Sequence, residues 1–164
     1  MARDVDADEP WRSPIHLLHR AGQCAEEIFH AEMGNRDLTP RQLAILIAVA
    51  EDEGTSQTGI TGRTGIDRST LTDLVSRLQG KRLLQRRRTK EDARMYAVIL
   101  TDEGRRVLDA VEPLAKRVDE RVLNALPKKQ RDHFMDALAS IVERLQALSS
   151  KDTGVVRGTR KRDT

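Results

Sequence analysis

The stretch from Asp67 to Arg94 constrains the fold more than any other part of the chain. A short amphipathic helix is predicted to start at Asp67, and two strand-length runs, residues 83–88 and 95–100, follow it directly with a charged turn between them. Residues 77–94 hold eight basic and two acidic side chains, which sum to +6. A helix followed by a basic hairpin fits double-stranded DNA, because the helix can enter a major groove while the hairpin reaches the backbone or a minor groove.

Positive charge is concentrated in this segment, because the whole chain carries only +3 and the remaining residues therefore sum to −3. A basic patch on a near-neutral body steers a polyanion toward one face. The chain has one Trp, one Tyr and two Phe. So few aromatic residues argue against binding of single strands, which stack their bases on aromatic platforms. The pattern favours a duplex partner.

Other classes of function find little support in the sequence. No Gly-rich phosphate loop, nucleophile elbow or paired-carboxylate pattern is visible, so we expect neither an enzyme nor a cofactor. The longest apolar run, residues 43–50, is too short to span a bilayer, and the acidic N-terminus has no apolar signal segment. A single cysteine allows no internal disulfide, and a reducing cytoplasm is the expected location.

Four helices are predicted before the hairpin. The first runs from Pro14 to about residue 33, and the second starts at a capping box formed by Thr39 and Gln42. A third, over residues 57–64, contains two glycines that each cost about 1 kcal/mol relative to alanine, so packing must hold it. Gly65 ends this helix, and the fourth is capped by Asp67. Two helices joined by a Gly-containing turn at this spacing indicate a helix-turn-helix.

Two further amphipathic helices are predicted after the hairpin. The first opens at Thr101 and should be kinked or broken by Pro113. The second follows a break at Leu126–Pro127. The helices at both ends of the chain have more apolar surface than the central module can cover, so we expect a symmetric homodimer, which also suits an operator with two half-sites.

The expected fold class is mainly α with a small β-hairpin wing, a winged helix-turn-helix flanked by dimerisation helices at both ends. The expected domain boundaries are a disordered N-terminus over residues 1–12, dimerisation helices over 13–36 and 102–149, a DNA-binding domain over 37–101, and a basic disordered tail over 150–164.

Three motifs together resemble the MarR family of winged helix-turn-helix transcriptional regulators. They are Leu38-Thr-Pro-Arg-Gln-Leu43, Gly65-Ile-Asp-Arg-Ser-Thr-Leu-Thr72, and Asp92-Ala-Arg94 followed by Leu100-Thr-Asp-Glu-Gly104. The resemblance covers about residues 14–148. It implies a homodimer that binds a pseudo-palindromic operator near a promoter and, usually, relief of repression by a small ligand.

The resemblance also implies roles for individual residues. The exposed start of the recognition helix contacts base edges and phosphates, the start of the preceding helix contacts phosphates, and the wing places an arginine in the minor groove with an aspartate that orients it. A guanidinium suits a narrow, negative minor groove. Together with the basic residues of the hairpin, the expected DNA-binding set is Ser56, Gln57, Arg68, Ser69, Thr70, Thr72, Arg77, Arg86, Arg88, Lys90, Asp92 and Arg94. Of the run Arg86–Arg88 only part should contact DNA, because alternate strand residues face opposite ways.

The chain departs from the family pattern just after the recognition helix. The family often has a glycine there, whereas this sequence has Arg82, with Gly80 two residues earlier. We therefore expect the end of this helix to be shifted or less well capped.

A small-molecule site is expected on the first helix. In family members that regulate aromatic catabolism, this region lines a pocket between the dimerisation helices and the DNA-binding lobe. Here it offers His19, Arg20 and Gln23, which suit a carboxylate or phenolate. The resulting hypothesis is a repressor released by an aromatic carboxylate or a phenol.

Alternative forms of control remain open at this point. Cys24 could sense oxidants, although a packed small apolar residue is the expected state. The histidines at positions 16, 19, 30 and 133 could suggest a metal sensor, but they show no diagnostic ligand spacing and no metal site is predicted. An architectural protein without sequence preference is a further alternative.

Overall fold

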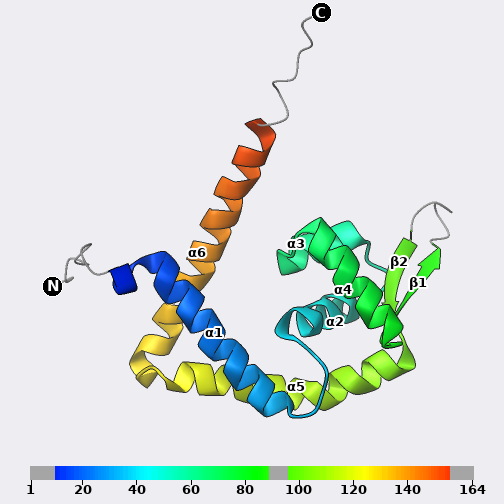
Figure 1. The fold of residues 1–164 in the computed structure, drawn as a ribbon, viewed down its shortest axis with the longest axis horizontal. Helices are drawn as coiled ribbons and strands as arrows, with labels where there is room; N and C mark the ends of the chain where they lie inside the picture. The colour runs from blue at the N-terminus through cyan, green and yellow to red at the C-terminus, as the bar shows by residue number, and fades with distance from the viewer. Residues whose placement is uncertain (1–9, 89–95, 156–164) are drawn as a thin grey trace, which may run out of the picture. The chain divides into compact units, whose positions relative to one another are not determined.

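The computed structural model describes residues 10–88 and 96–155, and it confirms the predicted mainly helical fold with one small antiparallel hairpin (Figure 1). The chain separates into two compact units, Met1–Val122 and Leu123–Thr164, which are described in turn. In chain order the elements are η1 (Pro10–Arg12), α1 (Pro14–Met33), α2 (Pro40–Glu51), α3 (Gln57–Thr64), α4 (Arg68–Gly80), β1 (Leu84–Arg88), β2 (Tyr96–Leu100), α5 (Asp102–Asn124) and α6 (Lys128–Val155).

Local hydrogen bonds start the helices where the sequence predicts. The Gln42 backbone N–H donates to Thr39 Oγ1 and the Thr39 N–H donates to Gln42 Oε1, both over 3.2 Å, which completes the capping box of α2. Ser13 Oγ accepts from the backbone of His16 at 3.3 Å and caps α1. Each of these bonds joins residues three positions apart, and this is why sequence alone can predict them.

The core of the first unit forms where α2, α3 and α4 meet. Its fully buried side chains include Ile45, Leu46, Val49, Ile60, Leu71, Val75 and Leu78. Gly59 of α3 faces the buried Thr55, and a Cβ at Gly59 would lie 2.3 Å from Thr55 Oγ1. A side chain at position 59 would therefore collide with Thr55, which favours glycine there despite its poor helix propensity.

The hairpin β1–β2 pairs Leu84 with Leu100 and Arg86 with Val98. The strand β2 is also tied to the loop before α3, because the Val98 N–H donates to the carbonyl of Thr55 at 3.0 Å and the Gly54 N–H donates to the carbonyl of Val98 at 3.3 Å. The hairpin is thus anchored at its base to the helix-turn-helix.

Helix α5 continues through Pro113, so of the kink or break expected at that residue the break is wrong. Pro113 is exposed, and water can bond the carbonyl left without a donor one turn earlier. The N-terminal half of α5 belongs with the helix-turn-helix core through the buried Val111. Near its other end, Arg117 and Arg121 both bind Glu32 of α1, and Arg121 Nη1 lies 2.8 Å from Glu32 Oε1. These bonds, with that from Arg117 the strongest, hold the pKa of Glu32 below its usual value.

The second unit contains α6, which follows the break predicted near Leu126–Pro127. The helix reaches Val155, so it extends into the segment that was expected to be a disordered tail. Likewise, the short η1 lies within the N-terminal segment that was expected to be disordered. Large apolar side chains of α6 are exposed in the single chain: Phe134, Met135, Ile141, Val142, Leu145 and Leu148.

Candidate nucleic-acid interface

The N-terminus of α4 is organised by one carboxylate. Asp67 Oδ1 accepts hydrogen bonds from the backbone N–H groups of Ser69 at 3.1 Å and Thr70 at 3.0 Å, and from Ser69 Oγ at 2.7 Å. Bonds from Thr70, and then from Ser69, hold the pKa of Asp67 well below its usual range, so the cap stays ionised. Asp67 therefore fixes the first turn of the helix that carries the expected base-reading residues.

Hydroxyl groups on this turn are already engaged as donors. Ser69 Oγ donates to Asp67, and Thr72 Oγ1 donates to the carbonyl of Arg68 at 2.8 Å. Phosphate oxygens can only accept, so neither hydroxyl can bond a phosphate without giving up its internal partner. What they offer outward is an acceptor, which suits the amino groups of cytosine or adenine in a major groove, and the Thr72 methyl suits a thymine methyl. Arg68 is exposed beside them.

Ser56 and Gln57 lie at the start of α3, and both are half-buried. Ser56 Oγ accepts from the Gly59 N–H at 3.1 Å as the N-cap of this helix. Its own hydroxyl proton has no acceptor in the bonds seen among the described residues. Ser56 can therefore donate to a phosphate while it keeps its cap.

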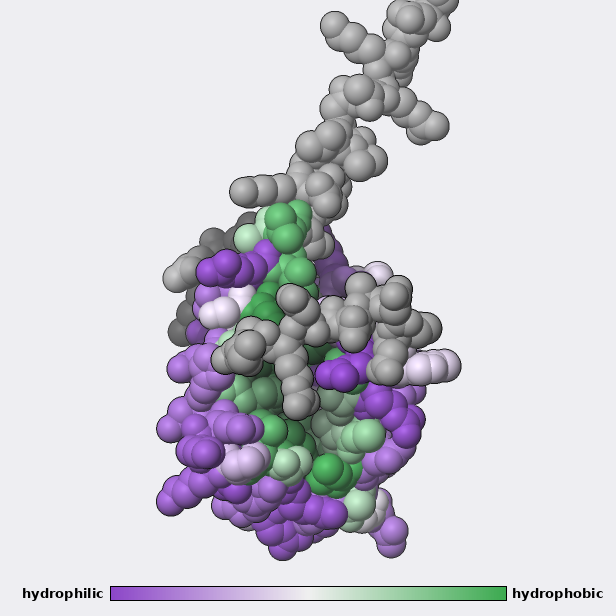
Figure 2. Space-filling view, turned by 90° about the vertical axis from the view of Figure 1, so that its left-hand side faces the viewer, coloured by the Kyte–Doolittle hydropathy of each residue, from purple (hydrophilic) through white to green (hydrophobic). Residues whose placement is uncertain are grey.

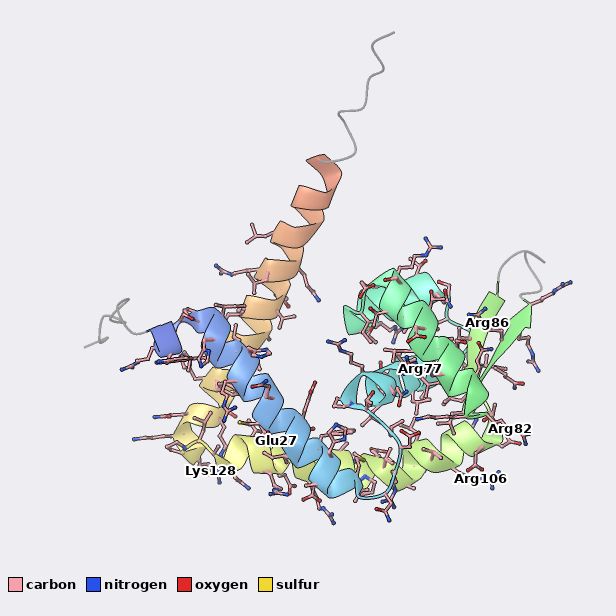
Figure 3. The ribbon with its side chains drawn as sticks, viewed as in Figure 1. Glu27, Arg77, Arg82, Arg86, Arg106 and Lys128 are labelled. Atoms are coloured by element: carbon pink, nitrogen blue, oxygen red, sulfur yellow. The ribbon has the colours of Figure 1, made fainter. Side chains whose placement is uncertain are left out.

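Exposed arginines of β1 continue the basic surface. The register places Arg86 and Arg88 on the same side of the strand as Leu84, while Arg87 faces the other way. Arg77 of α4 is exposed but forms an ion pair with Asp73, with Nε 3.0 Å from Oδ2. Figure 3 labels Arg77 on α4 and Arg86 on β1. The expected wing residues Lys90, Asp92 and Arg94 lie outside the described residues.

The turn between α4 and β1 corrects the expectation of a poorly capped helix end. The Leu83 N–H donates to the carbonyl of Leu78 and the Arg82 N–H donates to that of Gln79, both over 2.9 Å. These two bonds make a complete Schellman motif, with Leu78 and Leu83 both buried beside it. Arg82 holds the left-handed position at φ +59°, where glycine is favoured. The end of α4 is neither shifted nor frayed. The cost of having Arg82 where the family often has glycine is backbone strain at that residue.

Sequence reasoning overlooked the residues that hold this turn from the side of α5. Thr101 Oγ1 donates to the carbonyl of Arg82 at 2.6 Å, and the Thr101 N–H donates to that of Leu83 at 3.1 Å. Thr101 Oγ1 also accepts from the Gly104 N–H at 2.9 Å, so it caps α5 as well. The motif over residues 100–104 indicated the start of a helix, but it did not indicate that Thr101 bonds the turn after α4.

The expected ligand residues His19, Arg20 and Gln23 are exposed along α1. They do not line the cavity that lies between α2 and α5. This cavity has a volume of about 310 Å³ and is lined by Leu43, Ile47, Ala50, Glu51, Leu108, Glu112 and Ala115.

Cys24 is exposed in this chain, so its expected packing as a small apolar residue is wrong for the single protomer. Within the described ranges, no group of three or more His, Cys, Asp and Glu side chains is placed to hold a metal ion. Nor is any helix in those ranges long and apolar enough to cross a membrane.

Comparison with known proteins gives a consistent family. Residues 36–95 match the MarR family. The transcriptional regulator HosA of Escherichia coli is 30% identical over 106 residues, which cover 65% of this chain and 78% of HosA. Relatives of this kind are transcriptional regulators rather than enzymes.

Solved structures agree with the sequence matches. BpsR of Bordetella bronchiseptica, whose DNA binding is regulated by 6-hydroxynicotinic acid, superposes with a TM-score of 0.76 at 26% identity and covers 80% of this chain and 94% of its own. The transcriptional repressor CouR, solved bound to a 23-mer DNA duplex, gives a TM-score of 0.75 at 29% identity and covers 85% and 99%.

Proposed function

Because this chain belongs to the MarR family of DNA-binding transcriptional regulators, we propose that it is a dimeric repressor that leaves its operator when a small aromatic acid or phenol binds. The proposal rests on one observation: a capped recognition helix is followed by a strand with exposed arginines. Arg68, Ser69 and Thr72 are presented at the start of α4, and Arg86 and Arg88 extend along one side of β1.

DNA recognition divides between the two elements. The first turn of α4 enters the major groove, where its outward acceptors and Arg68 read base edges. The arginines of β1 and the hydroxyl of Ser56 bind phosphates, and Arg94 in the wing takes the minor groove. Since phosphate contacts release counterions, operator affinity falls steeply with salt concentration. A regulator of this kind acts in the cytoplasm, where the DNA is.

Exposed apolar side chains support the proposed dimer. On and beside α1 they are Trp11, Ile15, Leu17 and Leu18, and α6 adds its own set in the second unit. Figure 2 shows hydrophobic residues exposed at the surface beside hydrophilic ones. Exposed apolar side chains grouped along a helix in this way favour an interface. A symmetric dimer would cover it and present two recognition helices to a pseudo-palindromic operator.

The effector is proposed to use the cavity between α2 and α5. Its volume of about 310 Å³ suits a single aromatic ring, and Leu43, Ile47 and Leu108 provide apolar walls. Glu51 and Glu112 at its edge already pair with Arg63 and Lys116. The cation for an anionic effector therefore has to come from elsewhere, and we assign it to His19 and Arg20 of α1, with Gln23, in the assembled dimer. The regulation of BpsR by 6-hydroxynicotinic acid supports this ligand class.

Two measurements test the proposal. Footprinting on DNA upstream of the protein's own gene identifies the operator, and substitution of Arg94 by Ala should then cost about 1–3 kcal/mol of specific binding. Arg144→Ala, on the exposed surface of α6, is the matched control and should leave binding unchanged. Equal affinity for operator and random DNA would instead support an architectural protein, and unchanged binding of Arg94→Ala would refute the wing assignment.

The effector is tested with a panel of aromatic carboxylates, with peroxide and with a chelator. We expect an aromatic acid to release the operator, and Arg20→Ala to abolish that release while DNA binding persists. Release by peroxide that disappears in Cys24→Ser would overturn the ligand assignment in favour of redox control.

A further inference from the structure

The side chain of Lys81 is engaged in contacts within the protein, although its charge suggests a place on the DNA-binding surface. Lys81 is the C-cap of α4, and its Nζ lies 2.9 Å from Asp37 Oδ2 in the loop between α1 and α2. Nζ also donates to the backbone carbonyl of Asp37. The Lys81 side chain is only 27% exposed, although Asp37 is 89% exposed. An ammonium group held by two oxygens of one loop residue is an internal tie rather than a free cation.

The same ammonium group reaches the start of α2. Gln42 Oε1 lies 3.4 Å from Lys81 Nζ, and it is the atom that accepts from the Thr39 N–H in the capping box. Gln42 is 4% exposed, so its amide has a fixed position within the core. Lys81 therefore joins the end of the recognition helix to the loop that follows α1 and to the cap of α2.

On its other side, the turn after Lys81 is held by α5. Thr101 bonds the carbonyls of Arg82 and Leu83, the two residues that follow Lys81. The C-terminal end of α4 is thus held both by the loop that contains Asp37 and by Thr101 at the start of α5, which are distant from each other in sequence. The base-reading residues lie at the opposite end of this helix of 13 residues, about 20 Å away at 1.5 Å per residue. If α4 tilted by about 5° about its C-terminal end, the base-reading residues would move by about 2 Å over that length. A displacement of that size is more than a hydrogen bond tolerates.

We propose that Lys81 is a positioning residue for operator recognition: through Asp37 and Gln42 it sets the angle of α4, and it does not itself contact DNA. The inference rests on the proposed DNA-binding function. It also gives α1 a direct connection to the recognition helix, because Asp37 lies in the loop that leaves α1.

The alternative is that Lys81 belongs to the basic surface and binds a phosphate, and the two roles predict opposite effects at Asp37. Removing a carboxylate near a phosphate-binding lysine should strengthen DNA binding, because it removes repulsion and frees the cation. If the Asp37–Lys81 ion pair instead positions α4, removing the carboxylate should weaken operator binding, although the protein becomes more positive. The sign of the Asp37→Asn effect therefore separates the two roles.

The experiment measures affinity for the operator and for random duplex DNA across a salt series, with Lys81→Met, Asp37→Asn and the double variant in the full-length chain. Asp109→Asn is the matched control, since Asp109 is an exposed carboxylate for which the described residues show no ion pair. We expect each single variant to lose about threefold to tenfold in operator affinity, the double variant to lose no more than one single, and random-DNA affinity and the salt slope to stay unchanged.

Four outcomes overturn the inference. Tighter operator binding by Asp37→Asn, or a salt slope reduced by about one in Lys81→Met, would show direct phosphate contact. Equal loss on operator and random DNA would show general destabilisation rather than positioning. A wild-type chain that does not distinguish operator from random DNA would refute the proposed function first, and this inference with it.

Discussion

Gly104 of α5 lies against the carbonyl of Leu83 so closely that a Cβ built on Gly104 would stand 2.1 Å from the Leu83 oxygen. No real Cβ is accommodated at that distance from a backbone atom. The contact brings the first turn of α5 directly onto the turn that joins the recognition helix to the wing. Together with the Thr101 hydrogen bonds, it makes α5 the support on which the end of α4 rests.

Substitution of Gly104 by Ala should therefore destabilise the protein by about 1–3 kcal/mol, because the added methyl group forces α5 away from the turn. Thermal or denaturant unfolding measures the loss. Gly62→Ala is the matched control: its Cβ would meet nothing within 4 Å, so better helix propensity should stabilise the protein by up to about 1 kcal/mol. Equal effects of the two substitutions would contradict the close contact at Gly104.

Arg82→Gly should stabilise the protein by about 0.5–1 kcal/mol. The left-handed conformation at φ +59° costs an L-residue about 1–2 kcal/mol, and glycine avoids that cost while losing part of the gain to its freer unfolded state. Denaturant unfolding gives the difference, and Arg82→Ala should show no such gain because it keeps the strain. If Arg82→Gly were less stable than wild type, the Arg82 side chain would stabilise the fold by more than the left-handed backbone conformation destabilises it.

The cap of the recognition helix should make stability depend on pH. Because the pKa of Asp67 is lower in the folded state than in the unfolded chain, its contribution is complete above the unfolded value of about 3.9 and is lost as pH falls below it. Unfolding of wild type and Asp67→Asn from pH 7 to pH 2.5 checks this, since Asn caps helices but does not titrate. The wild-type advantage should shrink with acid. A difference that is constant across this range would show that ionisation of Asp67 does not matter.

The strand β1 should bind DNA from one side. Arg86→Ala and Arg88→Ala are each expected to lower the salt slope of operator binding by about one, because each removes a phosphate contact. Arg87→Ala, on the opposite side of the strand, is the control and should change the slope little. If Arg87→Ala has the largest effect of the three, the strand presents its other side to DNA.

The helices and their starts could be predicted because the interactions that set them are short in sequence. The Thr39–Gln42 capping box and the bonds of Asp67 to Ser69 and Thr70 join residues two or three positions apart, so the residue types at those spacings carry the information. The strands were also predicted from local sequence, as two strand-length runs on either side of a charged turn. Family motifs added the identity of the recognition helix.

Features of the turn after the recognition helix were decided only by tertiary structure. Lys81 was counted with the basic face from its charge, yet its partner Asp37 lies 44 residues away. Arg82 takes the left-handed position although a glycine stands two residues earlier, because Leu83 must enter the core and its carbonyl must meet Thr101. Glycine is likewise needed at position 104 because of a contact with Leu83, which lies 21 positions earlier. Sequence by itself determined where helices and strands begin, since those starts depend on near neighbours. How the recognition helix is held depends on atoms brought together only by packing.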